Sequence, residues 1–127
     1  MNKRDIDILK KILKYGEQIN EANRQFDTQK ENFEINSVYR NAVAMCVLQI
    51  GELVKHLSDE YKLQTCDKIP WHQIQGLRNV VAHEYGSIDS ESLWETVTED
   101  IPSLCDFCDE QISLHEQTQG DNQELKM

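Results

Sequence analysis

Residues 69–86 read I-P-W-H-Q-I-Q-G-L-R-N-V-V-A-H-E-Y-G, and this stretch predicts a helix that carries chemically capable side chains. Pro70 falls near the first turn, where its missing N–H costs little. One apolar stripe follows at helical spacing: Ile74, Leu77 and Val81. The helix is expected to stop near Gly86. Within this apolar pattern stand three polar residues whose side chains can do chemistry: Arg78, His83 and Tyr85.

Three further segments repeat the three- and four-residue spacing of apolar residues. The first helix is expected over about residues 3–26 and the second over about 36–58. Asn36 or Ser37 can cap the second helix, and a fourth helix should follow a cap at residue 89 or 90. The expected core rows are Ile8, Ile12, Tyr15 and Ile19 with Leu9 and Leu13 beside them; Val43, Val47, Ile50, Val54 and Leu57; and Trp94, Val97, Ile101, Leu104, Cys108 and Ile112.

The segments between and after these helices complete the predicted organisation. Residues 27–35 are polar and predict a loop or a loosely formed start of a helix, and residues 59–69 predict a connection. Pro102 should kink or divide the fourth helix. Residues 116–127 lack apolar periodicity, so we expect a disordered tail after a single domain over residues 1–115. The predicted fold class is all-α, an up-and-down bundle of four or five helices.

Composition limits the possible functions. A chain of 127 residues fits one domain, and no apolar run is long enough to span a membrane. The N-terminus has no apolar signal core, so a cytoplasmic protein is expected, in which disulfides are rare. Cys105 and Cys108 form a C-x-x-C inside an amphipathic helix without a second ligand pair, which favours buried thiols. No His, Cys or carboxylate cluster has metal-ligand spacing, so we predict no metal or other cofactor.

The net charge of −10 argues against a broad electrostatic grip on nucleic acid. The acidity is concentrated in the C-terminal third, because residues 84–127 carry 12 acidic side chains and one lysine. Residues 1–83 are close to neutral, with 11 acidic and 12 basic side chains. Binding of nucleic acid by the first two thirds of the chain is therefore still possible.

On an ideal helix Tyr85 lies about 20° from Arg78, whereas His83 lies about 140° from it. Either the helix loosens and redirects His83, or two chains related by a two-fold axis combine their Arg and His residues in one cleft. Each residue alone has a simpler interpretation, as a surface ion pair, a helix-dipole partner or a boundary aromatic. Together they supply a fixed cation, a group that titrates near neutrality and a modifiable hydroxyl.

The stretch R-N-V-V-A-H-E-Y resembles the R-x4-H-x-Y motif of HepT-like proteins in the HEPN superfamily of helical ribonucleases. The flanking sequences are also similar to the family. They are I-P-W-H-Q-I-Q-G-L-R-N before the motif, S-L-W-E-T-V-T-E-D-I-P after it, and L-Q-I-G-E-L-V-K-H-L-S in the second helix. The resemblance covers about residues 4–113.

This resemblance implies a homodimeric, metal-independent endoribonuclease, the toxin of a bacterial toxin–antitoxin pair of the type VII kind. By position, Arg78 and His83 would be catalytic, and Asn79 would support them by orienting the phosphate or the histidine. Tyr85 would receive AMP from a minimal nucleotidyltransferase antitoxin, which silences the toxin. The expected reaction is attack of the RNA 2′-hydroxyl on the adjacent phosphorus, with His83 as acid or base and Arg78 on the phosphate oxygens.

Two other functions remain open at this point. The chain could be a non-catalytic nucleotide-binding or substrate-binding subunit of a nucleotidyltransferase complex, or a structural protein that only dimerises. Glu52 and His56 could line the same cleft as Arg78, although their four-residue spacing favours a simple pair on a helix surface.

Overall fold

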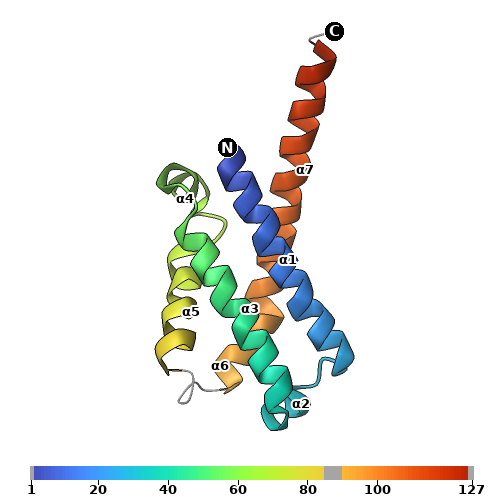
Figure 1. The fold of residues 1–127 in the computed structure, drawn as a ribbon, viewed down its shortest axis with the longest axis vertical. Coiled ribbons are helices and arrows are strands. Elements are labelled where there is room, and N and C mark those ends of the chain that lie inside the picture. Colours follow the sequence, from blue (N-terminus) through green and yellow to red (C-terminus); the bar gives the residue numbers. More distant parts are fainter. Residues whose placement is uncertain (1, 85–89, 126–127) are drawn as a thin grey trace.

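The structure is a computed structural model, and it describes residues 2–84 and 90–125. Four long helices run alternately up and down (Figure 1): α1 (Lys3–Gln25), α3 (Ser37–Lys55), α5 (Trp71–Glu84) and α7 (Ile101–Leu125). Shorter elements join them: α2 (Lys30–Ile35), α4 (Asp59–Thr65), α6 (Ser90–Glu95) and a π-helical turn, η2 (Thr96–Asp100). The described residues form no strand, and the predicted all-α fold is confirmed.

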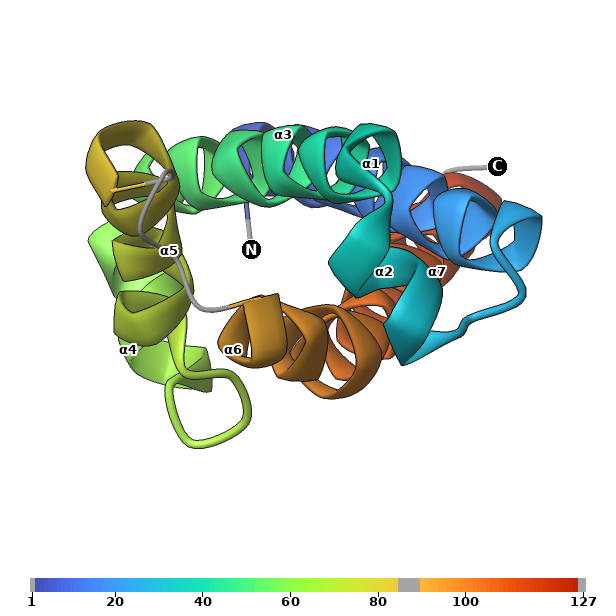
Figure 2. The ribbon, with the colours of Figure 1, turned by 90° about the horizontal axis from the view of Figure 1, so that it is seen from below.

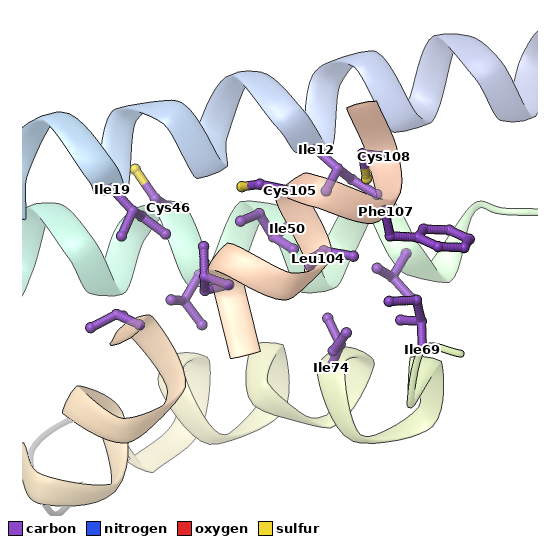
Figure 3. Close-up of a cluster of buried hydrophobic side chains, with 14 of the residues drawn as sticks. Ile12, Ile19, Cys46, Ile50, Ile69, Ile74, Leu104, Cys105, Phe107 and Cys108 are labelled. Carbon is purple, nitrogen blue, oxygen red and sulfur yellow. The ribbon is translucent and has the colours of Figure 1, made fainter. Parts of the chain in front are cut away.

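Helix α3 packs against α5 on one side and α1 on the other, and α7 packs against α1. Figure 2 shows α1 and α3 side by side as one layer, with α6 and α7 across from them and with α4 and α5 at one end. The core lies between these elements, where side chains from α1, α3, α5 and α7 meet (Figure 3).

The predicted core rows are confirmed. Every residue of the α3 row is buried, and so is every residue of the last row except Trp94, which is partly buried. In α1 and α5 only three members of the predicted rows are partly exposed: Leu13, Tyr15 and Leu77. Each fully buried Leu, Ile or Val side chain contributes about 1.5–3 kcal/mol, so these rows supply most of the force that assembles the bundle.

The start of α1 is tied to the start of α4 by buried polar contacts. Asn2 caps α1 by accepting from the Asp5 N–H at 2.7 Å. The Asp5 carboxylate is 1 % exposed and accepts from the Ser58 N–H at 2.9 Å and from the Ser58 hydroxyl at 2.7 Å. Ser58 in turn caps α4, because its Oγ accepts from the Tyr61 N–H at 3.2 Å.

Residues 59–65 form this helix α4, so the prediction of a plain connection over 59–69 was wrong for its first half. The helix has only seven residues, too few for apolar periodicity to be visible in the sequence. It is held by its cap and by Thr65, which donates to the Tyr61 carbonyl and accepts from the Trp71 indole at 2.8 Å.

Residues 27–35 contain a loop followed by helix α2. The loop turns where Asp27 and Thr28 adopt positive φ angles of 58° and 48°, a conformation that ends α1. Thr28 is held there by its N–H, which donates to the Asn23 carbonyl at 2.7 Å. Asn36 then caps α3 as predicted, accepting from the N–H groups of Val38 and Tyr39.

Pro102 lies directly after the junction of η2 and α7, where the sequence predicted a kink or a division of the helix. The turn η2 directly precedes α7, and the Ile101 N–H donates to the Thr96 carbonyl five residues back. Proline has no N–H to offer the carbonyl four residues before it, and its ring crowds that carbonyl. The helix widens by one residue at this point instead of breaking.

Helix α7 continues to Leu125 and so includes residues 116–125, the first part of the predicted tail. This part of α7 extends beyond the bundle (Figure 1). Its glutamine and glutamate residues favour helix, so the segment continues the last turn without an apolar face of its own. Among the helices within the described ranges, none is long and apolar enough to cross a membrane.

Candidate active site

Helix α5 lies so close to α3 that the two backbones nearly touch at one point. Gly51 of α3 faces Arg78 of α5: a β carbon at residue 51 would lie 3.1 Å from the Arg78 backbone nitrogen and 3.2 Å from its Cα. Gly51 itself is buried in α3. The absence of a side chain at this position allows the middle of α5 to lie against α3 and brings the next α3 residue, Glu52, beside Arg78.

The Arg78 side chain is held by a carboxylate from α3. Its Nε donates to Glu52 Oε2 at 3.0 Å, and one terminal nitrogen donates to the Asn79 side-chain oxygen at 3.2 Å. Both partners of the ion pair remain partly open to solvent, at 37 % for Arg78 and 36 % for Glu52. Since a guanidinium carries five N–H donors, this arrangement fixes the inner edge of the group and leaves other donors to bind an anion.

Glu52 also joins His56 to the site. His56 Nε2 lies 3.7 Å from Glu52 Oε1, one turn further along α3. The Glu52 carboxylate therefore accepts from Arg78 through one oxygen, and its other oxygen lies near the imidazole of His56. The helix-surface pair predicted between Glu52 and His56 is present, and the same carboxylate is also part of the surroundings of Arg78.

A small recess of about 140 Å³ lies beside Arg78. Its lining comes from the end of α3 and the middle of α5: Gly51, Glu52, Lys55, Gln75, Arg78 and Asn79. Two cations, two amides and one carboxylate make it a polar recess. Such a set of donors suits a phosphate oxygen better than an apolar ligand.

The remaining motif residues are only partly within the described structure. The backbone of His83 is helical, one residue before the end of α5, and its side chain lies outside the described residues. Tyr85 lies entirely outside them. Arg78 and the supporting Asn79 are thus placed together, and the roles of Arg78, His83, Asn79 and Tyr85 remain predictions.

The C-x-x-C pair is part of the core. Cys105 and Cys108 are buried in α7 and form no disulfide. Burial raises the pKa of the Cys105 thiol to about 11 and that of Cys108 to about 12, and nearby acidic groups act in the same direction. Their burial agrees with the sequence prediction, and buried thiols of this kind are unreactive. Among residues 2–84 and 90–125 no group of three or more His, Cys, Asp or Glu side chains could hold a metal ion.

The sequence favoured a surface pair of Glu52 with His56, and the contact of Glu52 with Arg78 was not predicted. The two residues are 26 apart in the chain, and their pairing depends on the rotation of α5 about its axis, which periodicity alone does not give. The available signal was Gly51. A glycine in the middle of an apolar helix indicates close approach of another backbone, and its polar neighbour then lies at that crossing.

Comparison with known proteins identifies the family of this chain. The family model described as "Ribonuclease HepT-like" matches residues 8–111. A protein of Methanocaldococcus jannaschii named "Putative RNase MJ1380" is 31 % identical over 105 residues, which cover 82 % of this chain and 94 % of that protein. The "Probable ribonuclease HepT" of Thermococcus cleftensis is 34 % identical over 98 residues, 77 % of this chain and 86 % of that one.

A second M. jannaschii protein, named "Putative RNase MJ0125", is 33 % identical over 105 residues, 82 % of this chain and 88 % of its own length. No solved structure gives a significant match. The family match covers α3 and α5 in full, with the R-x4-H segment, and parts of α1 and α7. The chain belongs to the HepT-like ribonuclease family.

Proposed function

We propose that this protein is a metal-independent endoribonuclease that acts as the toxin of a type VII-like toxin–antitoxin pair. The observation that carries the proposal is the Arg78 guanidinium, fixed by Glu52 through Nε at the edge of a polar recess, five residues before His83 on the same helix. The family match and the names of the relatives support ribonuclease activity.

The reaction needs only two kinds of group. The RNA 2′-hydroxyl attacks the adjacent phosphorus, the bond to the 5′-oxygen of the next nucleotide breaks, and a 2′,3′-cyclic phosphate and a 5′-hydroxyl result. His83 moves the proton, since an imidazole titrates near the working pH. Arg78 stabilises the charge that grows on the phosphate oxygens, which needs donors already in place. Asn79 contacts Arg78 and supports its orientation.

The complete site is expected to require two chains. On an ideal helix Arg78 and His83 point about 140° apart, so one copy of α5 does not direct both at one phosphate. A two-fold dimer with the α5 helices near the axis would place the arginine of one chain near the histidine of the other. Silencing is proposed to occur on Tyr85, where a nucleotidyltransferase antitoxin adds AMP and with it a negative charge close to the motif.

The deciding experiment is cleavage of a labelled RNA in EDTA by wild type, Arg78→Ala and His83→Ala. Wild type should cut and leave a 2′,3′-cyclic phosphate, and each variant should lose about 10²–10⁴-fold in rate while keeping its helical circular dichroism. Unchanged cleavage by His83→Ala would show that another group, or a contaminant, does the chemistry. Tight nucleotide binding without any cleavage would favour a non-catalytic subunit of a nucleotidyltransferase complex.

A further inference from the structure

A second, larger groove lies between the first half of α1 and the end of α3. It encloses about 590 Å³ and is lined by Lys3, Arg4, Asp7, Ile8 and Lys11 from α1, and by Leu53 and His56 from α3. The spacing of the α1 residues explains the groove: positions 3, 4, 7 and 11 follow one side of the helix, next to the buried Ile8. Charged residues therefore form its wall, and Leu53 contributes a partly buried apolar floor.

The groove is basic in a protein that is strongly acidic. Lys3, Arg4 and Lys11 are exposed, and in the part of the chain that the structure describes none of them forms an ion pair. Some cations elsewhere on the surface are instead paired: Arg24 with Glu21, Lys30 with Glu34 and Glu91, and Lys62 with Asp59. A cluster of unpaired cations in a chain of net charge −10 is available to an anionic ligand.

The groove and the recess at Arg78 lie on the two sides of the end of α3, and Glu52 and His56 connect them. His56 lines the groove and lies 3.7 Å from Glu52, and Glu52 accepts the Arg78 Nε at 3.0 Å. Lys55, next to His56 on α3, lines the Arg78 recess. Positive side chains thus continue from α1 across the end of α3 to α5. Taken together the groove and recess hold five Lys and Arg side chains and two carboxylates, a formal charge of +3.

We propose that this groove binds the backbone of single-stranded RNA on one side of the cleavage point and directs it to Arg78. The proposal rests on the proposed ribonuclease function and adds the surface that holds the substrate. Phosphates contact Lys3, Arg4 and Lys11, while a base or a sugar packs on Leu53. Among residues 2–84 and 90–125, none beyond Asn79 lines either hollow.

The test separates binding from cleavage. The probe is a fluorescein-labelled oligoribonucleotide of mixed sequence with 2′-O-methyl groups, which lacks the nucleophile and cannot be cut. Its binding to the full chain is followed by fluorescence anisotropy over a series of salt concentrations. The groove variant replaces Lys3, Arg4 and Lys11 by Gln, and all three side chains are exposed, so the fold is retained.

The control variant replaces Arg24, Lys30 and Lys62 by Gln, which changes the net charge by the same amount away from the groove. The groove variant should bind at least about tenfold more weakly at low salt, with a salt slope smaller by about 2, since each phosphate contact in a single strand contributes about 0.7. Cleavage of unmodified RNA should show a raised KM with little change in kcat. The control should behave as wild type.

Each other outcome has a defined meaning. If wild type cuts RNA and the groove variant keeps its affinity and salt slope, the groove does not bind RNA, whereas the ribonuclease proposal stands. An equal loss in both triple variants would show a general effect of charge and overturn the groove. If the groove variant instead binds RNA normally but no longer binds the antitoxin, the groove is a protein surface. A further result is that wild type binds RNA in a salt-dependent way, loses this binding in the groove variant, and yet cuts no RNA. That result would overturn the ribonuclease proposal and support the groove as an RNA-binding surface.

Discussion

A β carbon placed on Gly51 would lie 2.6 Å from the β carbon of Arg78, closer than two such atoms can be. Gly51→Ala must therefore push α5 away from α3 and displace Arg78 from Glu52. We expect the free energy of unfolding to fall by about 1–3 kcal/mol, the usual cost of overpacking. RNA cleavage should fall more than stability explains, measured as initial rate at a temperature where the variant is folded.

Gly76 provides a control on α5 itself. A β carbon there would meet no heavy atom within 4 Å. Gly76→Ala should leave cleavage unchanged and raise the free energy of unfolding by up to about 1 kcal/mol, because alanine favours helix. Urea denaturation followed by circular dichroism measures both variants. Equal behaviour of the two alanines would contradict the close approach at Gly51.

Glu52 is expected to act as a positioning residue, through Arg78. Glu52→Gln keeps an oxygen that can accept from Nε, whereas Glu52→Ala leaves Nε without its acceptor. A hydrogen bond to a charged group contributes about 1.5–3 kcal/mol. The kcat of Glu52→Ala should therefore fall about tenfold or more, and the kcat of Glu52→Gln should lie between that of Glu52→Ala and that of wild type. A rise in KM alone, or full activity of Glu52→Ala, would rule out this role.

The composite site can be tested by mixing two inactive variants. If Arg78 of one chain works with His83 of the other, a heterodimer of Arg78→Ala and His83→Ala chains contains one intact pair. Mixing and reassociating the two proteins should then restore cleavage, up to about one quarter of the wild-type rate: half of the dimers are mixed, and each has one of two sites. No recovery would mean that both residues act within one chain. A monomer in sedimentation at micromolar concentration would exclude the dimer.

Tyr85 is expected to be the site of silencing. With the antitoxin and ATP, the mass of the chain should rise by AMP units and cleavage should stop, since the added phosphodiester competes with RNA phosphate for Arg78. Tyr85→Phe should remain an active nuclease that the antitoxin does not modify. Modification of Tyr85→Phe, or of wild type without loss of cleavage, would remove Tyr85 from this role.

The buried thiols predict how stability depends on pH. Burial raises the pKa of Cys105 to about 11 and of Cys108 to about 12, whereas in the unfolded chain thiols titrate near about 8.5. Above that value the unfolded state loses protons that the folded state keeps, so the free energy of unfolding should fall as pH rises toward 11. Each thiol contributes on the order of 1 kcal/mol per pH unit.

Chemical denaturation between pH 8 and 10.5 measures this slope. Replacing Cys105 and Cys108 by Ala should flatten it, although the variant is less stable at neutral pH. Cys66 is exposed, and Cys66→Ala should leave the slope unchanged. In thiol labelling of the native protein, the exposed Cys66 should react before the buried Cys105 and Cys108. An identical slope in all three proteins would assign it to other groups.

The sequence predicted the long helices well because their burial follows the helical period. Val43, Val47, Ile50 and Val54 recur at that spacing, and all four are buried. Helix α4 escaped prediction because it is shorter than two turns of pattern and depends on Ser58, whose partner Asp5 lies 53 residues earlier. Such long-range polar contacts leave no local periodicity.

The sequence indicated which residue is central to the candidate site, but it did not indicate which side chains surround that residue. The motif in α5 pointed to Arg78 from the residue types alone. The pairing with Glu52 and the groove along α1 both depend on how three helices are rotated against one another. That rotation depends on the packing of the whole core. Gly51 contributes to this packing because the absence of a side chain lets α5 approach α3 closely.

The packing of α1 against α7 has a consequence for folding during translation. The first helix is synthesised early, yet it packs against the last one, α7, which begins 76 residues after α1 ends. At 5–20 residues per second, α1 waits for its partner for about 4–15 s. A chain stopped after residue 100 should therefore expose the Ile12 side of α1 and bind a hydrophobic dye. In the cell, the bundle that carries the nuclease motif would close only as synthesis reaches its final helix.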